Sequence, residues 1–307
     1  MSNQESDKVQ SHLGRNVIIT GGNSGLGFES AVRFSAMGAR VILACRNENK
    51  ANKACATIRE MVPNSNVEFM HLDLSSLSSI ERFCVDFKRR FSRLDILMNN
   101  AGVMAIPKRM TEDGFEMQFG TNHLGHFALT GRLLECLLET ESSRIVTITS
   151  LAANSSKIKF GNLDSRKNYN RWIAYGQSKL ANMLFGLELQ RRLEAVTGST
   201  ISVLAHPGFS STNLQKGIVE GGGKLGGVTE KIIRSVCQTQ EQGVLPQLYA
   251  ATNTDVRGGQ YFGPSGFMGM RGGASEQKVP RSGRSIKDAR KLWDASLDLT
   301  GVSYGRF

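Results

Sequence analysis

The sequence predicts an α/β fold with a doubly wound, mostly parallel sheet, and two observations indicate it. Short β-branched runs without period-two alternation recur along the chain, as in strands that are buried on both faces. Longer amphipathic segments lie between them, and repeated strand-then-helix units build a parallel sheet with helices on both sides. Because no repeat or linker interrupts the pattern, residues 16–307 are expected to form one domain after a polar tail at 1–15.

The expected elements follow from these runs in chain order. The predicted strands are VIIT (17–20), VILA (41–44), VEFM (67–70), LDILM (94–98), RIVTIT (144–149) and TISVLA (200–205). The predicted helices occupy 25–37, 48–62, 76–91, 112–139 and 174–196, and a terminal helix with an apolar face is predicted at about 285–300. The glycine-rich stretches 217–227 and 257–273 are expected to be loops, and a substrate loop is expected at about 208–228.

Composition and charge limit the class of protein. A content of 40% hydrophobic and 21% charged residues suits a globular chain and excludes a disordered, collagenous or coiled-coil one. Five cysteines without a C-x-x-C pair, and no apolar run of about 18 residues, indicate a cytoplasmic protein without an integral membrane segment. The net charge of +11 suits an anionic partner such as a phosphorylated cofactor. The basic residues of 278–291 are interpreted as a solvated helix face, not as a nucleic-acid site.

A glycine-rich turn follows the first predicted strand, in VIITGGNSGLG. Glycine tolerates positive φ and lets backbone N–H groups approach a pyrophosphate, and the N-terminus of the next helix favours negative charge. An ordinary glycine-rich βα turn is the alternative. The turn supplies six candidate cofactor-binding residues, namely Gly21, Asn23, Ser24, Gly25, Leu26 and Gly27.

The end of the second predicted strand indicates which dinucleotide binds. NAD sites place an acidic residue there on the ribose 2′-hydroxyl, but VILACRNENK has none at 44–46. Arg46 offers a planar guanidinium for the 2′-phosphate of NADP, with Lys50 as support. We therefore expect NADP(H) as the cofactor, and the alternative is that Arg46 is a solvated loop charge.

Polar and glycine-containing turns follow the third and fourth predicted strands. Asp73 lies in HLDLSS, and Asn100, Ala101 and Gly102 lie in NNAG. Ligands bind at the carboxyl ends of strands in open α/β sheets, so these residues are candidates for the same site. The alternatives are that Asp73 caps the helix beginning near Ser75 and that NNAG is only a turn.

Tyr175 and Lys179 are four residues apart on a predicted helix and share one face. A phenol with a pKa near 10 is a poor acid or base at neutral pH. An ammonium about 5 Å away, at an effective dielectric of about 20, would lower that pKa by roughly two units. Ser150 ends the preceding strand, where its hydroxyl can bond a substrate carbonyl. The alternative is an accidental surface pair of Tyr175 and Lys179.

The order of these motifs resembles the short-chain dehydrogenase/reductase family, from about Asn16 to at least Thr212. The matching pieces are TGGNSGLG, CRN, HLDL, NNAG, TNHLGHF, ITSLA, YGQSK and HPGFSST. Within the family, CRN, the long approach to YGQSK and the GGQYFGPSGF segment are similar to the branch of the retinol dehydrogenases and the WW-domain-containing oxidoreductase. Light-dependent protochlorophyllide reductase is a relative of that branch.

The resemblance implies a Rossmann-type fold and an NADP-dependent dehydrogenase or reductase that acts on CH–OH and C=O groups. It implies that Tyr175 is the acid/base, that Lys179 lowers its pKa and binds the nicotinamide ribose, and that Ser150 holds the substrate oxygen. It also implies that Asn122 kinks its helix and positions a water that links Lys179 to solvent. The cofactor contacts that it implies are Asp73, Leu74, Asn100, Ala101, Gly102, Pro207, Gly208 and Thr212. Helices 112–139 and 174–196 form the usual dimer face of the family, so a homodimer is considered beside a monomer.

The predicted substrate pocket is apolar, which favours a lipophilic aldehyde, ketone or alcohol such as a retinoid, a steroid or an aromatic carbonyl. Its candidate lining residues are Ile158, Phe160, Trp172, Ile173, Phe209 and Leu214, although core packing would explain half of them. Three other functions stay open at this point: a C=C reductase that uses the same proton donor, a non-catalytic NADP sensor, and a nucleic-acid binder. His123 and His126 have a spacing that metals use, but no ligand cluster accompanies them, so no metal is expected.

Overall fold

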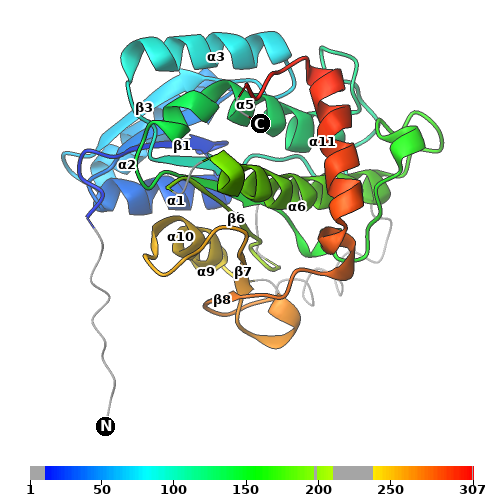
Figure 1. Ribbon diagram of the computed structural model, residues 1–307. Helices are drawn as coiled ribbons and strands as arrows, with labels where there is room; N and C mark the ends of the chain where they lie inside the picture. Colours follow the sequence, from blue (N-terminus) through cyan, green and yellow to red (C-terminus); the bar gives the residue numbers. More distant parts are fainter. Residues whose placement is uncertain (1–10, 197–198, 210–237, 306) are drawn as a thin grey trace, which may run out of the picture.

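An eight-stranded sheet in the order β3-β2-β1-β4-β5-β6-β7-β8 runs through the computed structural model (Figure 1), which describes residues 11–196, 199–209, 238–305 and 307. The strands are β1 (Asn16–Thr20), β2 (Arg40–Cys45), β3 (Asn66–His71), β4 (Ile96–Asn99), β5 (Arg144–Ile148), β6 (Ile201–Ala205), β7 (Tyr261–Pro264) and β8 (Ala274–Glu276). Neighbouring strands pair parallel from β3 to β7, and β8 pairs antiparallel to β7. The predicted single-domain, doubly wound α/β fold is confirmed.

Helices and short helical turns connect the strands. The helices are α1 (Gly25–Ala36), α2 (Glu48–Met61), α3 (Leu77–Arg90), α4 (Met117–Phe119), α5 (Gly125–Leu138), α6 (Arg171–Val196), α9 (Gln240–Gly243), α10 (Leu245–Thr252) and α11 (Ile286–Thr300). A π-helical turn occupies Gly120–Leu124, and 3-10 turns occupy Leu151–Ala153, Phe160–Asn162, Phe267–Gly269 and Arg281–Arg284. Across the described ranges, no helix combines the length and the apolar content needed to cross a membrane.

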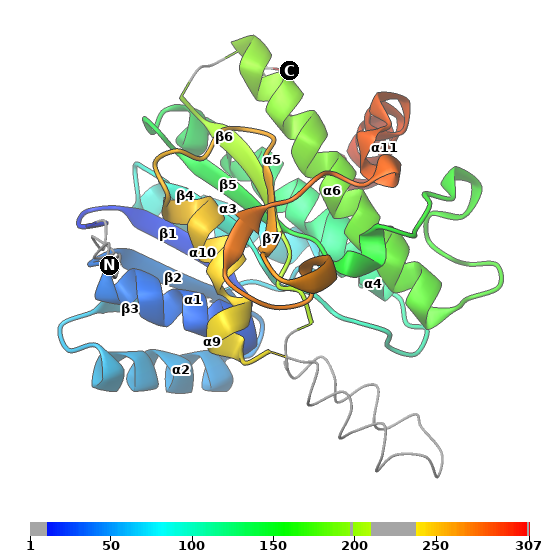
Figure 2. The same ribbon diagram turned by 90° about the horizontal axis from the view of Figure 1, so that it is seen from below.

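The sheet lies between two layers of helices (Figures 1 and 2). Successive residues of a strand point to opposite faces, so Ile18 packs in the cluster that includes α3, α5 and α6, while Val17 and Ile19 pack in the cluster that includes α1, α2 and α10. Both faces are covered, which is why the strands are apolar without alternation. The two clusters form the core of the domain.

Three expectations about local structure need correction. The stretch 257–273 is not only loop, since it contains β7, whose short YFGP sequence carries too little periodicity to be recognised alone. The helix predicted at 112–139 begins at Met117 and is interrupted by the π-turn. The helices α9 and α10 were not expected. The other glycine-rich stretch, 217–227, and most of the substrate loop at 208–228 lie outside the described residues.

The sheet changes its winding direction between β1 and β4, and this position sets the location of the site. The strands β1 and β4 are neighbours, but the helix that follows β1 covers one face of the sheet and α5, which follows β4, covers the other. The two connections therefore leave a crevice at the carboxyl ends of β1 and β4, where α/β proteins bind ligands. Thr20 ends β1 there, and Asn99 ends β4.

The C-terminal helix α11 packs beside α6 (Figures 1 and 2) and carries an aromatic cluster onto it. Trp293 packs against the rings of Phe127 and Phe185, and Tyr304 donates a hydrogen bond to the carbonyl of Phe127 (2.7 Å). Gly131 has no side chain where the Tyr304 ring lies, since a Cβ would come within 2.6 Å of it. The α11 helix and the residues after it therefore cover part of α5 and α6.

Four buried histidines predict acid lability of the fold. Burial lowers the pKa of His12, His126 and His206 to about 4 and that of His123 to about 3. The unfolded chain, with histidine pKa values near 6.5, binds more protons in this range, so the free energy of unfolding falls as the pH drops below about 6.5. Each histidine should contribute a loss of about 2 kcal/mol between pH 7.5 and pH 5 in urea titrations.

A His12→Leu variant isolates one of these contributions. Neither ring nitrogen of His12 has a hydrogen-bond partner in the described part of the chain, and the ring packs edge-on against Phe34. The substitution therefore removes a titrating group without removing a side-chain hydrogen bond. The loss of stability between pH 7.5 and pH 5 should shrink by about 2 kcal/mol. A pH dependence equal to that of the wild type would contradict the assignment.

Candidate active site

A cleft of about 450 Å³ opens at the carboxyl ends of β1, β4 and β5. Twelve of the predicted site residues line it, from four separate segments of the chain: Gly21, Asn23, Ser24, Gly25, Leu26, Gly27, Asn100, Ala101, Gly102, Tyr175, Lys179 and Pro207. The glycine turn after β1 and the NNAG turn after β4 are therefore two walls of one cleft, and α6 contributes Tyr175 and Lys179.

Missing side chains shape the floor of this cleft. A Cβ on Gly27 would lie 2.5 Å from the Gly21 carbonyl oxygen and 2.6 Å from Nδ2 of Asn100, so the first turn of α1 packs directly on the two walls. Gly21 has φ +66°, which other residues rarely adopt. A Cβ on Gly102 would lie 3.3 Å from the Lys179 ammonium. The result is a channel lined by backbone, of the kind that lets a phosphate-containing ligand approach N–H groups.

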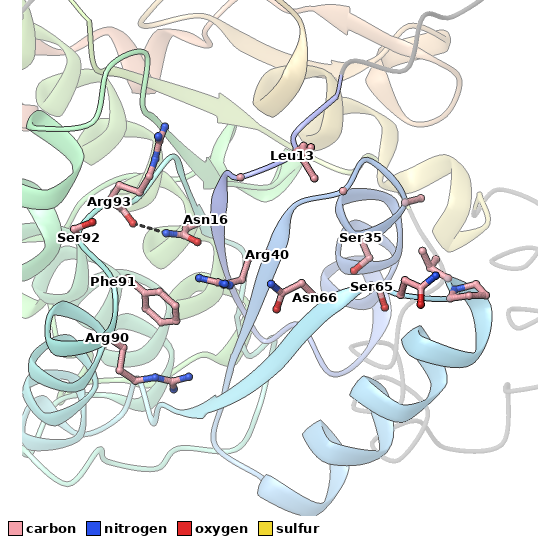
Figure 3. A pocket seen from close by; sticks show the side chains of 16 residues that line it. Leu13, Asn16, Ser35, Arg40, Ser65, Asn66, Arg90, Phe91, Ser92 and Arg93 are labelled. Atoms are coloured by element: carbon pink, nitrogen blue, oxygen red, sulfur yellow. Dashed lines mark hydrogen bonds between the residues drawn. The ribbon is translucent and has the colours of Figure 1, made fainter.

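A second cavity, of about 620 Å³, is lined by residues at the amino ends of β1 to β3, several of which Figure 3 labels. It is lined largely by polar side chains, and the guanidinium groups of Arg40 and Arg90 lie over the Phe91 ring at 5.4 and 5.1 Å. Arg40 begins β2, so this cavity is at the amino ends of the strands, away from the switch point. The smaller cleft at the carboxyl ends is the better candidate for chemistry, because it joins titratable groups to the glycine turn.

Tyr175 and Lys179 are both buried, with 8% and 5% of their surfaces exposed. Burial lowers the pKa of Lys179 to about 8, and its ammonium donates to the Ile148 carbonyl (3.2 Å), which uses one of its three hydrogens. The Thr149 hydroxyl donates to the Lys179 carbonyl (2.8 Å), so the end of β5 holds this part of α6 in place.

The expected effect of Lys179 on the phenol needs correction. Burial raises the pKa of Tyr175 above its usual value of 10, and a hydrogen bond with the Ser150 hydroxyl only partly opposes that increase. The ammonium of Lys179 is held toward Ile148, and desolvation, which a pairwise Coulomb argument omits, dominates the pKa of the phenol. The structure does place Tyr175 and Lys179, both in the N-terminal part of α6, on the same cleft, and the Ser150 side chain acts on the Tyr175 phenol.

Asn122 lies in the π-turn, and its side chain hydrogen-bonds to the backbone of Val103, the residue that follows the NNAG turn. Its Oδ1 accepts from the Val103 N–H (2.8 Å), and its Nδ2 donates to the Val103 carbonyl and to Ser178 Oγ (both 2.9 Å). The turn is wider than an α-helix, because the Gly125 N–H donates to the carbonyl of Gly120, five residues back. The predicted irregularity of the helix at Asn122 is therefore present.

Four other residues predicted to bind the cofactor follow β2 and β3 and are not among those that line the cleft: Arg46, Lys50, Asp73 and Leu74. Arg46 has a side chain 68% exposed and forms an ion pair with Asp73 at 3.6 Å. The Oδ1 of Asp73 accepts from the N–H and the hydroxyl of Ser75 (2.9 and 2.6 Å), whereas the N-cap of α3 is Ser76 and not Asp73. Lys50 is exposed in the first turn of α2, and Leu74 is buried.

None of the described residues that were predicted to line the substrate pocket is among those that line the cleft. Ile158 and Phe160 are partly buried and pack against the apolar cluster around α4, α6 and α11. Trp172 and Ile173, in the first turn of α6, are about half exposed, and so is Phe209. Gly208, with φ +63°, packs against the Met270 carbonyl. Two further predicted residues, Thr212 and Leu214, lie outside the described residues.

Sequence analysis missed an apolar wall of the cleft. Val103, Met104 and Ile106 line it, together with Ile148 and Thr149 at the end of β5. The available signal was the apolar run VMAI (103–106) directly after NNAG, at the carboxyl end of a predicted strand.

The fold and this cleft define a dinucleotide-binding oxidoreductase of the Rossmann type, and comparison with known proteins identifies the family. Residues 15–222 match the profile of the short chain dehydrogenases. The chain is 39% identical to retinol dehydrogenase 14 of Mus musculus over 94% of its own length and 86% of the mouse protein. It therefore belongs to the short-chain dehydrogenase family, in a branch with the retinol dehydrogenases, and is an oxidoreductase that acts on alcohol or carbonyl groups.

Solved structures agree with this assignment. An uncharacterised protein of Mycobacterium paratuberculosis is 38% identical and superposes with a TM-score of 0.79, with 97% of each chain covered. A short chain dehydrogenase of Shigella flexneri, solved with NADP, is 20% identical and has a TM-score of 0.63, over 81% of this chain and 96% of that one. The second likeness shows the fold alone. The fold indicates a nicotinamide cofactor, and the backbone-lined channel from Gly21 to Gly102 fits one.

Gly27→Ala tests the close packing of the glycine turn. The added Cβ would overlap the Gly21 carbonyl, so the turn must shift, and the free energy of unfolding should fall by about 1–3 kcal/mol. Gly161→Ala is the matched control, because nothing lies within 4 Å of a Cβ at that exposed position. It should change the free energy of unfolding by less than about 0.5 kcal/mol. Equal effects in urea titrations would show that the contacts of Gly27 do not limit its side chain.

Proposed function

We propose that this protein is an NADP(H)-dependent dehydrogenase or reductase in which Tyr175 exchanges a proton with the oxygen of a lipophilic alcohol or carbonyl compound. The observation that carries the proposal is that a buried phenol and a buried ammonium line the same cleft as the glycine turn. The Ser150 side chain opposes the rise in the Tyr175 pKa, which supports a role for its hydroxyl next to the phenol, with both reaching one substrate oxygen.

The bound nicotinamide supplies or accepts the hydride at the substrate carbon. In reduction, Tyr175 donates its phenolic proton to the carbonyl oxygen as that oxygen becomes an alcohol, and in oxidation the phenolate takes the proton back. Ser150 donates a hydrogen bond to the same oxygen and stabilises its developing charge. Lys179 supplies a positive charge at the cleft, and the two N–H groups that the Ile148 carbonyl does not use can hold the cofactor ribose.

NADP(H) is the proposed dinucleotide, and Arg46 supports it. A surface ion pair contributes only about 0–1 kcal/mol to stability, so replacing the contact of Arg46 with Asp73 by a contact with a phosphate costs little free energy. Charge-assisted, bidentate bonds between a guanidinium and a phosphate are stronger than such a pair. The NADP bound to the short chain dehydrogenase of Shigella flexneri shows that this fold accepts that cofactor in another member.

The proposed substrate is lipophilic and resembles a retinoid, a steroid or an aromatic carbonyl in its apolar character. Val103, Met104 and Ile106 give the cleft an apolar wall beside Tyr175, which supports this class. The similarity to a protein named retinol dehydrogenase 14 points the same way.

Location and assembly are proposed on separate grounds. Cys45, Cys55, Cys84 and Cys136 are free and buried, which supports a reducing compartment such as the cytoplasm.

For a homodimer, the helices α5 and α6 offer less free surface than expected, because α11 packs on α6 and Tyr304 packs on α5. A homodimer would use what remains of that face or a different one.

Tyr175→Phe tests the proton transfer. The variant keeps the ring but loses the acidic hydrogen, so turnover of a carbonyl substrate should fall at least about a hundredfold while NADPH binds as before. Turnover is followed by the absorbance of NADPH over a panel of lipophilic carbonyls, with product analysis to separate C=O from C=C reduction. Tyr249→Phe, at a partly exposed tyrosine of α10, is the matched control and should keep full activity. Activity of the Tyr175→Phe variant equal to that control would refute the assignment.

Arg46→Ala tests the choice of cofactor. Loss of the guanidinium should weaken NADPH binding about 10- to 100-fold and change NADH binding little, because only NADPH carries the 2′-phosphate. Fluorescence titration with each dinucleotide measures both. Arg89→Ala removes another exposed arginine, ion-paired to Asp86 on α3, and should affect neither. Equal losses for NADPH and NADH at position 46 would mean that the phosphate is held elsewhere.

A further inference from the structure

His126 is a fully buried histidine on α5 that the chemistry described so far does not use. Its Nδ1 lies 2.9 Å from the backbone carbonyl oxygen of Asn122, in the π-turn. Its Nε2 lies 2.9 Å from Thr20 Oγ1, at the end of β1. The ring therefore connects the π-turn at Gly120–Leu124 to β1, the strand that leads into the glycine turn.

For a neutral ring, these contacts favour one arrangement of hydrogens. A carbonyl oxygen can only accept, so Nδ1 carries the hydrogen and Nε2 is left as an acceptor for the Thr20 hydroxyl, whose other acceptor, the Met98 carbonyl oxygen, is farther away at 3.2 Å. Thr20 Oγ1 in turn accepts from the N–H groups of Asn100 and Ala101, both at 2.9 Å. A neutral ring is consistent with this pattern, and burial lowers the pKa of His126 to about 4.

The NNAG turn is thus held at both ends. Thr20 holds the N–H groups of Asn100 and Ala101, and Asn122 holds Val103 through two hydrogen bonds. Gly102 lies between these two sets of hydrogen bonds, close to the Lys179 ammonium. His126 is the group that connects them, because it contacts Thr20 with one nitrogen and the backbone of Asn122 with the other.

We propose that His126 is a positioning residue that locks residues 100–103 to the Asn122 turn, so that the cofactor-binding backbone and Lys179 keep one arrangement. The proposal rests on the proposed function, since residues 100–102 are expected to contact the cofactor. It assigns no bond to substrate or cofactor to His126 itself. Breaking the link releases the loop while the catalytic side chains stay present.

Thr20 and His126 variants test the link. Thr20→Val keeps the shape but removes the oxygen that the Asn100 and Ala101 N–H groups and His126 share, and His126→Phe keeps a ring without nitrogens. Each should weaken NADPH binding about tenfold and lower kcat, measured where circular dichroism shows the variant folded. Thr20→Ser restores the hydroxyl and should recover most of the lost affinity. The double variant Thr20→Val/His126→Phe should bind no more weakly than the worse single variant, because both changes break one link.

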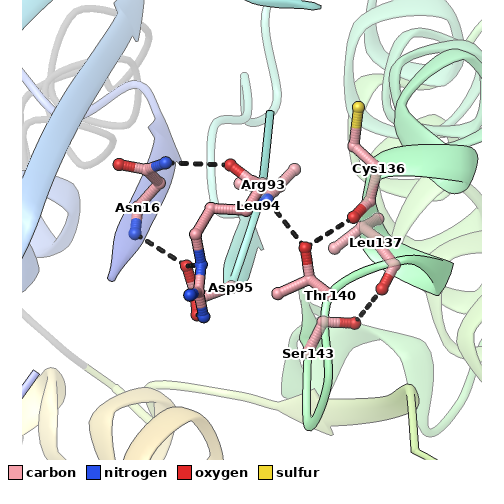
Figure 4. A network of polar contacts seen from close by, with 8 residues as sticks. All are labelled: Asn16, Arg93, Leu94, Asp95, Cys136, Leu137, Thr140 and Ser143. Carbon is pink, nitrogen blue, oxygen red and sulfur yellow. Dashed lines mark hydrogen bonds and ion pairs between the residues drawn. The ribbon is translucent and has the colours of Figure 1, made fainter. Parts of the chain in front are cut away.

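Thr140→Val is the matched control for Thr20→Val. Thr140 is also a buried threonine whose hydroxyl accepts from a backbone N–H, but it lies at the amino end of β4, away from the cleft. Thr140 Oγ1 accepts from the Leu94 N–H (3.1 Å) and donates to the Cys136 carbonyl (2.7 Å), as Figure 4 shows. Its loss should lower stability but leave the affinity for NADPH and kcat unchanged. An equal loss of affinity in the Thr140 and Thr20 variants, an unchanged affinity in His126→Phe, or additive effects in the double variant would overturn the proposal.

Nitrogen NMR of the histidine rings gives a test that does not depend on the folding of the His126 variant. The wild-type His126 should be the neutral Nδ1–H tautomer, and Thr20→Val should shift its Nε2 resonance, because that nitrogen loses its donor. An Nε2–H tautomer in the wild type would refute the bridge. Should the wild type bind NADPH but turn over no carbonyl, the proposed function fails and the affinity ratios still decide the role of His126.

Discussion

Burial of the Lys179 ammonium, in the cleft that the Tyr175 phenol also lines, is the constraint on which the rest of the site depends. A cation that is almost fully removed from water is costly unless polar groups surround it, and its lowered pKa records that cost. The Ile148 carbonyl and the missing side chain at Gly102 leave room for the ammonium at the cleft. In the proposed function, a bound dinucleotide supplies the remaining polar contacts of the ammonium.

The backbone of the fold gives this pair its position. The switch between β1 and β4 creates the cleft, the end of β5 holds α6 through Thr149, and the π-turn turns Asn122 toward the NNAG loop. Each contact comes from a strand end or from a helix that packs on the sheet, which is why rigid elements and not long loops set the geometry. His126 adds a link between two of these elements.

Much of this was predictable from the sequence because it depends on local patterns. The strands from β1 to β6 are apolar runs with clear ends, and the glycine turn and the spacing of Tyr175 and Lys179 place known chemistry at those ends. The features that the sequence did not predict correctly, or could not decide, depend on tertiary context. The strand β7 is held by its neighbours more than by its own four residues, and the apolar side chains of Ile158 and Phe160 fit a core as well as a pocket. The pKa of Tyr175 is raised and not lowered as expected, because burial raises it and the sequence does not show how deeply a side chain is buried.

The most direct test of the account is a crystal structure of the protein with NADP⁺ and an unreactive lipophilic alcohol. The account predicts that the nicotinamide half lies against Tyr175 and Lys179 and that the oxygen of the alcohol touches the Tyr175 phenol and the Ser150 hydroxyl. A dinucleotide bound in the cleft with both side chains out of contact with it and with the alcohol would contradict the account, and the chemistry would then have to be sought elsewhere on the fold.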